Sequence, residues 1–201
     1  MKYNKIYYRH GTMFSGKSLR LISLYDSYIY KNKNILVAKP AKDTRDVDVI
    51  SSRMSDKKID CYTFTDEDNL VDLVNQYKQE FGRPDLILID EVQFATIEHI
   101  EQINILSLNY KIMCYGLKLT YTADLFPSIA KLLTIAEDVE EIKSECFMCQ
   151  SKATHNLLLR NDKPVYSGVY INIENKTHTT EEYKAVCRYH YYNPVIDQDA
   201  V

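Results

Sequence analysis

The stretch GTMFSGKS at residues 11–18 constrains this 201-residue chain more than any other part of its sequence. The pattern G-x-x-x-x-G-K-S is typical of a loop whose backbone N–H groups, here those of residues 12–18, surround a chain of phosphates. KIYYRH at 5–10 predicts a strand before the loop, and apolar residues at helical spacing over 19–29 predict a helix after it. A strand, a glycine loop and a helix in this order are the context that phosphate binding requires.

The residue types in this loop have distinct chemical roles. Gly11 and Gly16 permit a close approach of the backbone, Lys17 reaches the terminal phosphates, and Ser18 offers a hydroxyl ligand to Mg²⁺. The other predicted members of the phosphate site are Thr12, Met13, Phe14 and Ser15. The loop therefore predicts a nucleotide bound with Mg²⁺.

A second motif, LILIDE at residues 86–91, ends an apolar run with two acids. Asp90, at the carboxyl end of a buried strand, can hold the water shell of Mg²⁺ opposite Ser18. Glu91 points elsewhere and can accept a proton from the group that attacks the terminal phosphate. An acid pair of this kind is equally typical of ATPases, in which the glutamate orients water. Together the two motifs predict ATP and Mg²⁺ and leave the phosphate acceptor open.

Strand and helix patterns alternate along most of the chain. The expected strands span 5–10, 35–39, 61–64, 85–91 and 110–117, and the expected helices span 19–29, 70–77, 97–106 and 127–139. Residues 41–56 are expected to form a polar loop, and Thr65 with Asp68 a capping box for the helix at 70–77. Strands that are nearly continuous in apolar residues predict an α/β fold: a P-loop NTPase-like, mostly parallel sheet flanked by helices.

From residue 140 the pattern changes to short β-like pieces, which predicts a second, smaller domain. We expect a main domain over 1–142, a small domain over 143–192 and a flexible tail over 193–201. Cys146 and Cys149 in CFMC, and Cys187 and His190 in CRYH, have the spacing with which two pairs of ligands close on one tetrahedral Zn²⁺. Four protein ligands leave no open position, so this Zn²⁺ is expected to be structural.

The remaining cysteines and histidines show no partner spacing. Cys61 and Cys114 fall in predicted strands and are expected to be buried and unreactive. A structural role is expected for the histidines outside CRYH, which are His10, His99, His155 and His178.

Charge and composition argue against several classes of protein. The formal net charge is −3 with 26% charged residues, so no globally basic surface indicates a nucleic-acid partner. The apolar runs are too short to span a bilayer. Five cysteines without a secretory signal before them indicate a reducing compartment. We therefore expect a cytoplasmic protein that binds neither a membrane nor a nucleic acid.

The ordered set of motifs closely resembles one family, the cellular-type (type II) thymidine kinases with a zinc lasso. The resemblance covers roughly residues 3–192 and rests on GTMFSGKS, KPAKDTR, IDEVQF, YGLKLTYTADLFP, CFMC and EYKAVCRYHY. It implies transfer of the γ-phosphate of ATP to the 5′-hydroxyl of thymidine or deoxyuridine, which gives dTMP from thymidine for DNA synthesis. It also implies a homotetramer and feedback inhibition by dTTP.

The resemblance also implies roles for the residues that match the family's positions. Glu91 falls where the family has its general base. Besides the loop at 11–18, the implied ATP and Mg²⁺ region contains Asp43, Thr44, Arg45, Asp90 and Gln93. The positions that enclose the thymine ring or belong to the lasso above it are Met13, Phe94, Leu117, Tyr121, Phe126, Tyr170, Ile171, Asn172, Ile173, Glu174 and Tyr183.

Two departures from the family pattern lie in the implied thymidine site. Tyr121 stands where phenylalanine is usual, so its hydroxyl needs a partner or water. Glu174 and Asn175 stand where the lasso usually has two glycines, which permit tight turns with positive φ. The path of the lasso, and the choice between thymidine and deoxyuridine, therefore stay open.

One interpretation of the function other than a kinase stays open as an alternative. A P-loop ATPase could use the zinc element as a clamp for nucleic acid, which predicts a basic face and hydrolysis stimulated by DNA or RNA. A GTPase has less support, since the sequence contains no N-K-x-D guanine motif.

Overall fold

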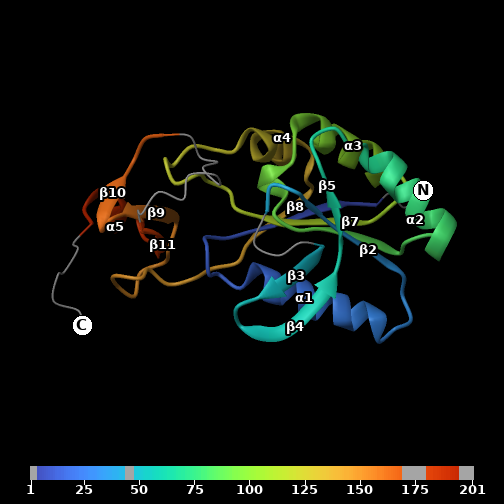
Figure 1. The fold of residues 1–201 in the computed structure, drawn as a ribbon, viewed down its shortest axis with the longest axis horizontal. Helices are drawn as coiled ribbons and strands as arrows, with labels where there is room; N and C mark the ends of the chain where they lie inside the picture. The colour runs from blue at the N-terminus through green and yellow to red at the C-terminus, as the bar shows by residue number, and fades with distance from the viewer. Residues whose placement is uncertain (1–3, 44–47, 169–179, 195–201) are drawn as a thin grey trace.

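The computed structural model describes residues 4–43, 48–168 and 180–194 of the chain. Its main feature is a six-stranded sheet of order β5-β2-β6-β7-β1-β8, in which every neighbouring pair is parallel (Figure 1). The strands are β1 (Ile6–His10), β2 (Ile35–Pro40), β5 (Tyr62–Phe64), β6 (Leu86–Ile89), β7 (Ile112–Gly116) and β8 (Asp138–Glu141). The predicted α/β fold with a mostly parallel sheet is confirmed.

Helices cover both faces of this sheet, because neighbouring residues of each strand point to opposite sides and both sides are apolar. The helices are α1 (Lys17–Ile29), α2 (Leu70–Phe81), α3 (Ile97–Ser107) and α4 (Pro127–Ile135). Leu36 and Ile87 pack in the core beneath α2, α3 and α4, whereas Val37 and Leu88 pack in the core beneath α1 (Figure 1). In the described part of the chain, no helix combines the length and the apolar character needed to cross a membrane.

The segment 41–56, predicted as a polar loop, contains most of a β-hairpin instead. Strands β3 (Val49–Ser52) and β4 (Ser55–Asp60) pair antiparallel, and both contact α1. Ile50 and Ile59 are buried and anchor the hairpin in the same core as α1. These two apolar residues are widely separated among polar ones, so the sequence lacks the alternating pattern that would reveal the strands.

The helix predicted over 127–139 ends at Ile135, and the residues after it form β8. Ala136 leaves the helical conformation with ψ 124°. The N–H of Glu137 donates to the carbonyl of Ile6 at 3.1 Å, and its Oε2 accepts from the N–H of Ile6 at 2.8 Å. Pairing with the edge of β1 therefore overrides the helical periodicity of this segment.

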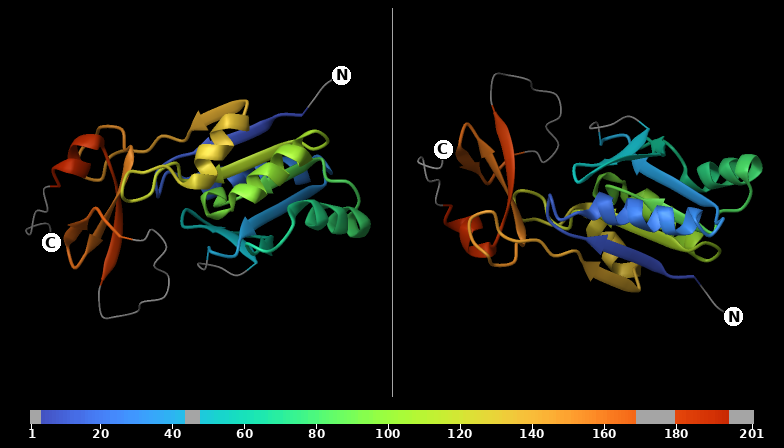
Figure 2. Two further views of the ribbon diagram at one scale, coloured as in Figure 1. Left: turned by 90° about the horizontal axis from the view of Figure 1, so that it is seen from above. Right: turned by 90° about the horizontal axis from the view of Figure 1, so that it is seen from below.

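A smaller, antiparallel sheet of order β10-β9-β11 carries the C-terminal part of the described chain. Its elements are β9 (His155–Arg160), β10 (Lys163–Val165), β11 (Glu181–Val186) and the short helix α5 (Arg188–Tyr192). We call the described residues from 143 onward, which contain this sheet and α5, the small lobe; Figure 2 shows it at the end of the molecule away from the N-terminus. The predicted boundary at 142/143 falls between the two sheets and stays a prediction, and most of the predicted tail lies outside the described residues.

Helix α2 is capped by Asn69, so the predicted capping box is wrong. Oδ1 of Asn69 accepts from the N–H groups of Val71 at 2.8 Å and Asp72 at 3.3 Å. The N–H and hydroxyl of Thr65 do donate to Oδ2 of Asp68, but this pair closes a turn before the helix begins. An asparagine at the N-cap supplies the acceptor that the capping box was expected to supply.

Replacing Asn69 by alanine should destabilise the protein by about 1 kcal/mol, because two N–H groups of the first turn lose their acceptor. Chemical denaturation followed by circular dichroism measures the change, with Thr65→Ala as the control. An equal loss in Thr65→Ala would show that the upstream turn, rather than Asn69, sets the start of the helix.

Candidate active site

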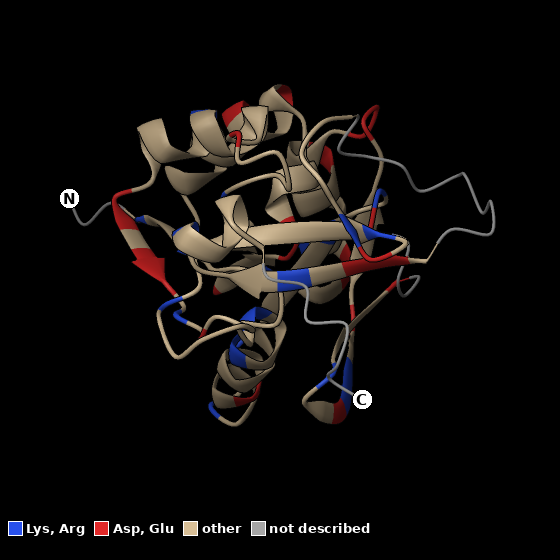
Figure 3. Cartoon of the chain, turned by 90° about the vertical axis from the view of Figure 1, so that its left-hand side faces the viewer, with Lys and Arg blue, Asp and Glu red and all other residues tan. Residues whose placement is uncertain are grey.

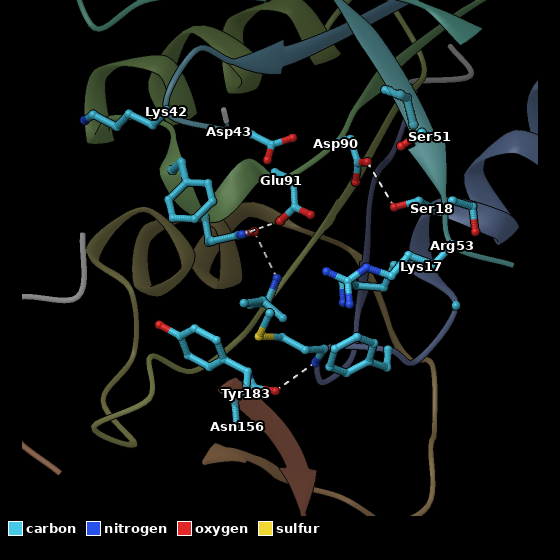
Figure 4. A pocket seen from close by; sticks show the side chains of 18 of the residues that line it. Lys17, Ser18, Lys42, Asp43, Ser51, Arg53, Asp90, Glu91, Asn156 and Tyr183 are labelled. Atoms are coloured by element: carbon cyan, nitrogen blue, oxygen red, sulfur yellow. Dashed lines mark hydrogen bonds between the residues drawn. The ribbon is translucent and has the colours of Figure 1, made fainter. Parts of the chain in front are cut away.

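A pocket of about 570 Å³ lies where the carboxyl ends of β1, β2, β6 and β7 meet the small lobe (Figure 4). The predicted site residues that line it are Met13, Phe14, Gly16, Lys17, Ser18, Asp43, Asp90, Glu91, Gln93, Phe94, Leu117, Tyr121, Phe126 and Tyr183. Gly11, Thr12 and Ser15 belong to the same loop as Lys17 without being part of the lining. Thr44, Arg45 and the predicted positions 170–174 lie outside the described residues.

The glycine loop joins β1 to α1, as the sequence predicts. Gly16 has a φ of 83°, and a Cβ at Gly11 would lie 2.5 Å from the carbonyl oxygen of Ile142. Both positions therefore require glycine. The side chain of Lys17 is buried, and its Nζ donates to the carbonyl of Thr12 at 2.8 Å. The ammonium group is thus held against the loop itself.

Two N–H groups of the loop do not point toward its centre, which corrects the prediction for residues 12–18. The N–H of Met13 donates to Oδ1 of Asn156 at 2.8 Å, and that of Ser15 donates to the carbonyl of Thr12 at 3.3 Å. Oγ1 of Thr12 also lies 2.7 Å from Oγ of Ser144. Asn156 is a buried residue of β9, so the loop is fastened to the small lobe. The sequence gives no signal for this contact, because Asn156 is a single polar residue at the start of an apolar strand.

The two acids that follow β6 face different partners. Oγ of Ser18 donates to Oδ2 of Asp90 at 3.4 Å (Figure 4). Glu91 has φ 47° and ψ 37°, a left-handed conformation that costs a non-glycine residue about 1–3 kcal/mol. Its Oε2 accepts from Nε2 of Gln93 at 2.5 Å. The left-handed turn therefore separates a carboxylate beside the glycine loop from a second carboxylate beside Gln93.

A buried ion pair places Asp43 in the pocket. Nζ of Lys39 lies 3.2 Å from Oδ2 of Asp43, and these side chains are only 2% and 8% exposed. The same ammonium donates to the carbonyl of Val49 in β3 at 3.0 Å. Removing either charge would break this ion pair and leave the other charge buried, which is strongly unfavourable. Lys39, which the sequence analysis missed, therefore ties the end of β2 to the hairpin.

The hairpin brings further residues into the pocket that the sequence analysis missed. The guanidinium carbon of Arg53 lies 4.8 Å from the ring centre of Phe14, a cation–π contact that brings a positive charge to the glycine loop. Arg53 carries no recognisable motif, because its segment has the composition of a loop. The lining residues for which the sequence predicted no role in the site are Lys42, Val49, Ile50, Ser51, Ser52, Arg53, Met54, Leu119, Thr120, Asn156 and Glu181.

Another part of the pocket is formed by aromatic side chains. The rings of Phe94 and Phe126 meet edge to face with their centres 6.1 Å apart. Tyr121 lines the pocket beside them, and the hydroxyl of Tyr191 in α5 donates to its carbonyl at 2.6 Å. Tyr183 enters from β11 (Figure 4), and burial raises the pKa of its hydroxyl. Walls of this kind suit a flat ring that is held by a few hydrogen bonds at its edge.

The structure brings the four predicted metal ligands together in the small lobe. Their ligand atoms all lie within 4.8 Å of one another; Sγ of Cys187 is 3.9 Å from Sγ of Cys149 and 3.4 Å from Nδ1 of His190. Bonds of about 2.0–2.3 Å to a tetrahedral Zn²⁺ place ligand atoms roughly 3.5–3.8 Å apart. Hydrogen bonds from Ser151 lower the pKa of the Cys149 thiol to about 6, which favours the thiolate that binds metals. The geometry of the cluster, completed by Cys146, thus fits a tetrahedral metal ion.

The other two cysteines follow the prediction, with one change of position, and so does His99. Burial raises the pKa values of Cys61 and Cys114 to about 12, so neither thiol is reactive. Cys114 lies in β7, whereas Cys61 comes directly before β5. His99 has a structural role: it forms a reciprocal capping box with Thr96 at the start of α3. His178 lies outside the described residues.

Comparison with known proteins matches residues 4–191 to the family model described as "Thymidine kinase". A thymidine kinase of Streptococcus gordonii is 35% identical over 196 residues, which cover 96% of this chain and 98% of the relative. A thymidine kinase of Streptococcus pyogenes serotype M3 is 33% identical over 195 residues, or 96% of this chain and 99% of the relative. Among solved structures, the Legionella pneumophila ATPase DotB matches 75% of this chain and 44% of its own, with a TM-score of 0.41 and 16% identity.

Replacing Cys187 by serine should remove the metal from the small lobe and lower the melting temperature of the protein, because metal binding contributes directly to folding. Elemental analysis of purified protein should find about one zinc ion per chain in the wild type and almost none in the variant. Cys61→Ser is the matched control and should keep its metal. Wild-type protein without a stoichiometric metal would contradict this interpretation of the cluster.

Proposed function

The chain belongs to the thymidine kinase family, and from this premise we propose that it transfers the γ-phosphate of ATP to the 5′-hydroxyl of thymidine, giving dTMP and ADP. One observation carries the proposal: a single pocket is lined by the glycine loop, by the two acids after β6 and by a group of aromatic rings. Phosphoryl transfer depends mainly on positioning and on neutralising charge, and this lining offers groups for both.

The glycine loop would hold the phosphates of ATP. Its backbone, the N-terminus of α1 and the ammonium of Lys17 supply N–H groups and positive charge. Mg²⁺ would be held by Ser18 and Asp90, whose oxygens lie 3.4 Å apart and have the hard character that this ion prefers. When bound, Mg²⁺ neutralises charge on the phosphates. Arg53 adds a further cation beside the loop through its contact with Phe14.

Glu91 would accept the proton of the 5′-hydroxyl as its oxygen attacks the γ-phosphate. Its carboxylate is buried and lines the same pocket as Lys17, so attacker and phosphate can meet there. Phe94, Tyr121 and Phe126 would enclose the thymine ring, with Tyr183 above it. A covered nucleoside also excludes water, which favours transfer over hydrolysis of ATP. Positions 170–174 complete this wall in the family and stay a prediction, as do the homotetramer and inhibition by dTTP.

We also propose that the cluster of Cys146, Cys149, Cys187 and His190 binds a structural Zn²⁺. Its four protein ligands leave no position open for a substrate or water. The ion would hold the ends of the small lobe together, and through Asn156 this lobe is bonded to the glycine loop. Zinc would therefore support phosphate binding without taking part in the reaction.

The alternative, a nucleic-acid clamp, finds little support in the charges of the small lobe. Arg160 lies 2.7 Å from Glu181, and Lys152 lies 2.8 Å from Glu141. On the side of the molecule shown in Figure 3, acidic and basic segments are interspersed along the described chain. Tracking a phosphate backbone needs clustered cations with stacking aromatic residues. The match of the family model along the chain also favours the kinase.

Replacing Glu91 by glutamine should lower kcat for thymidine by roughly 10²–10⁴, because the base is lost while the shape of the site is kept. The measurement is transfer from ATP–Mg²⁺ to a panel of nucleosides that includes deoxyuridine. Glu98→Gln is the control. Glu98 is exposed at the start of α3, so this variant should behave as wild type. ATP hydrolysis without a nucleoside, stimulated by DNA or RNA, would instead support the clamp.

Replacing Asn156 by alanine should weaken ATP binding about tenfold, because the partly buried N–H of Met13 loses an acceptor worth about 1–1.5 kcal/mol and the loop is held less firmly. Titration calorimetry below the melting temperature measures the affinity. Asn161→Ala, in the exposed turn after β9, is the control and should bind ATP normally. Unchanged affinity in Asn156→Ala would show that the loop keeps its shape without the small lobe.

A further inference from the structure

Gln93 is buried and is bonded to Glu91 and Leu117 through its side-chain amide and to Ser128 through its backbone. Its Nε2 donates to Oε2 of Glu91 at 2.5 Å, and its Oε1 accepts from the N–H of Leu117 at 3.0 Å. Its backbone carbonyl accepts from the hydroxyl of Ser128 in α4 at 2.8 Å. Although the resemblance groups Gln93 with the ATP and Mg²⁺ region, its amide is bonded to the acid and to the end of β7.

The orientation of this amide follows from its partners. A backbone N–H can only donate, so the atom of Gln93 that faces Leu117 must be the oxygen, and the nitrogen then faces Glu91. The amide occupies the space beside Gly116, where a Cβ would lie 2.5 Å from its Oε1. Packing and hydrogen bonding therefore hold the donor toward the carboxylate.

From this geometry we infer that Gln93 is a positioning residue for Glu91, which it holds in its left-handed conformation with one carboxylate oxygen bonded to the amide and the other directed to the substrate. The inference rests on the proposed function, in which Glu91 accepts the proton. A carboxylate bonded to a fixed donor keeps a fixed direction, and a general base must lie within hydrogen-bond reach of the proton that it accepts. Because Leu117 also lines the pocket, the same amide joins the base to the wall proposed for thymine.

Two substitutions at position 93 separate the two functions of the amide. Gln93→Glu keeps an acceptor for Leu117 but places a second carboxylate beside Glu91, whereas Gln93→Met loses both bonds. Gln102→Met is the matched control, since Gln102 is also buried and its Oε1 accepts from the N–H of Leu70 at 2.8 Å. The control should lose stability without any change at Glu91.

The split between kcat and KM for thymidine is the readout that a merely structural role would not move. Gln93→Glu should lower kcat about tenfold or more with KM nearly unchanged, because Glu91 loses its donor while the N–H of Leu117 keeps its acceptor. Gln93→Met should lower kcat by a similar factor and also raise KM, because the wall at Leu117 then loses its acceptor as well.

Wild-type kcat in both Gln93 variants, with Glu91→Gln inactive, would overturn the inference and leave the proposed function standing. Full activity of Glu91→Gln would instead remove the base assignment and this inference with it. If the Gln93 variants do not fold, Ser128→Ala loosens Gln93 from outside the pocket. It should lower kcat by a smaller factor than the Gln93 variants do, and an unchanged kcat would count against the role of Gln93.

Discussion

The whole site depends on one constraint of the parallel sheet: the carboxyl ends of all its strands lie at the same edge. β1 leads into the glycine loop, β6 into Asp90 and Glu91, and β7 into Leu117. Strands far apart in sequence thus deliver a phosphate loop, a pair of acids and an apolar wall to one place. The edge alone leaves the pocket open on its outer side, and the small lobe covers that side with Tyr183 and Asn156.

The small lobe is bonded to the larger sheet at the residues that would do the chemistry. Asn156 accepts from the loop at Met13, and Tyr191 donates to the backbone of Tyr121. Glu91 is also held by a hydrogen bond. Its backbone has a costly left-handed conformation, and its carboxylate accepts from the side chain of Gln93. Asn156 and Tyr191 therefore hold parts of the proposed site from the small lobe, and Gln93 holds Glu91 from within the same turn.

Much of the fold and of the candidate site could be predicted from the sequence. The remaining features depend on contacts that local sequence patterns do not reveal. The glycine loop, the acids after β6 and the four metal ligands follow spacing rules that act over a few residues. The hairpin at 49–60 and strand β8 do not, because their form depends on α1 and on the free edge of β1. Lys39, Arg53 and Asn156 were missed for the same reason. Each is a single polar residue whose role is set by contacts distant in the sequence.

A crystal structure with thymidine and adenosine joined through their 5′-oxygens by a chain of phosphates tests the central claim most directly, since one molecule then occupies both halves of the pocket. We expect the phosphates on residues 11–18, the thymine ring among Phe94, Tyr121 and Phe126, and the carboxylate of Glu91 facing the 5′-oxygen of thymidine. A ligand bound with its thymidine end outside the pocket, or with this oxygen out of reach of Glu91, would contradict the assignment of the site.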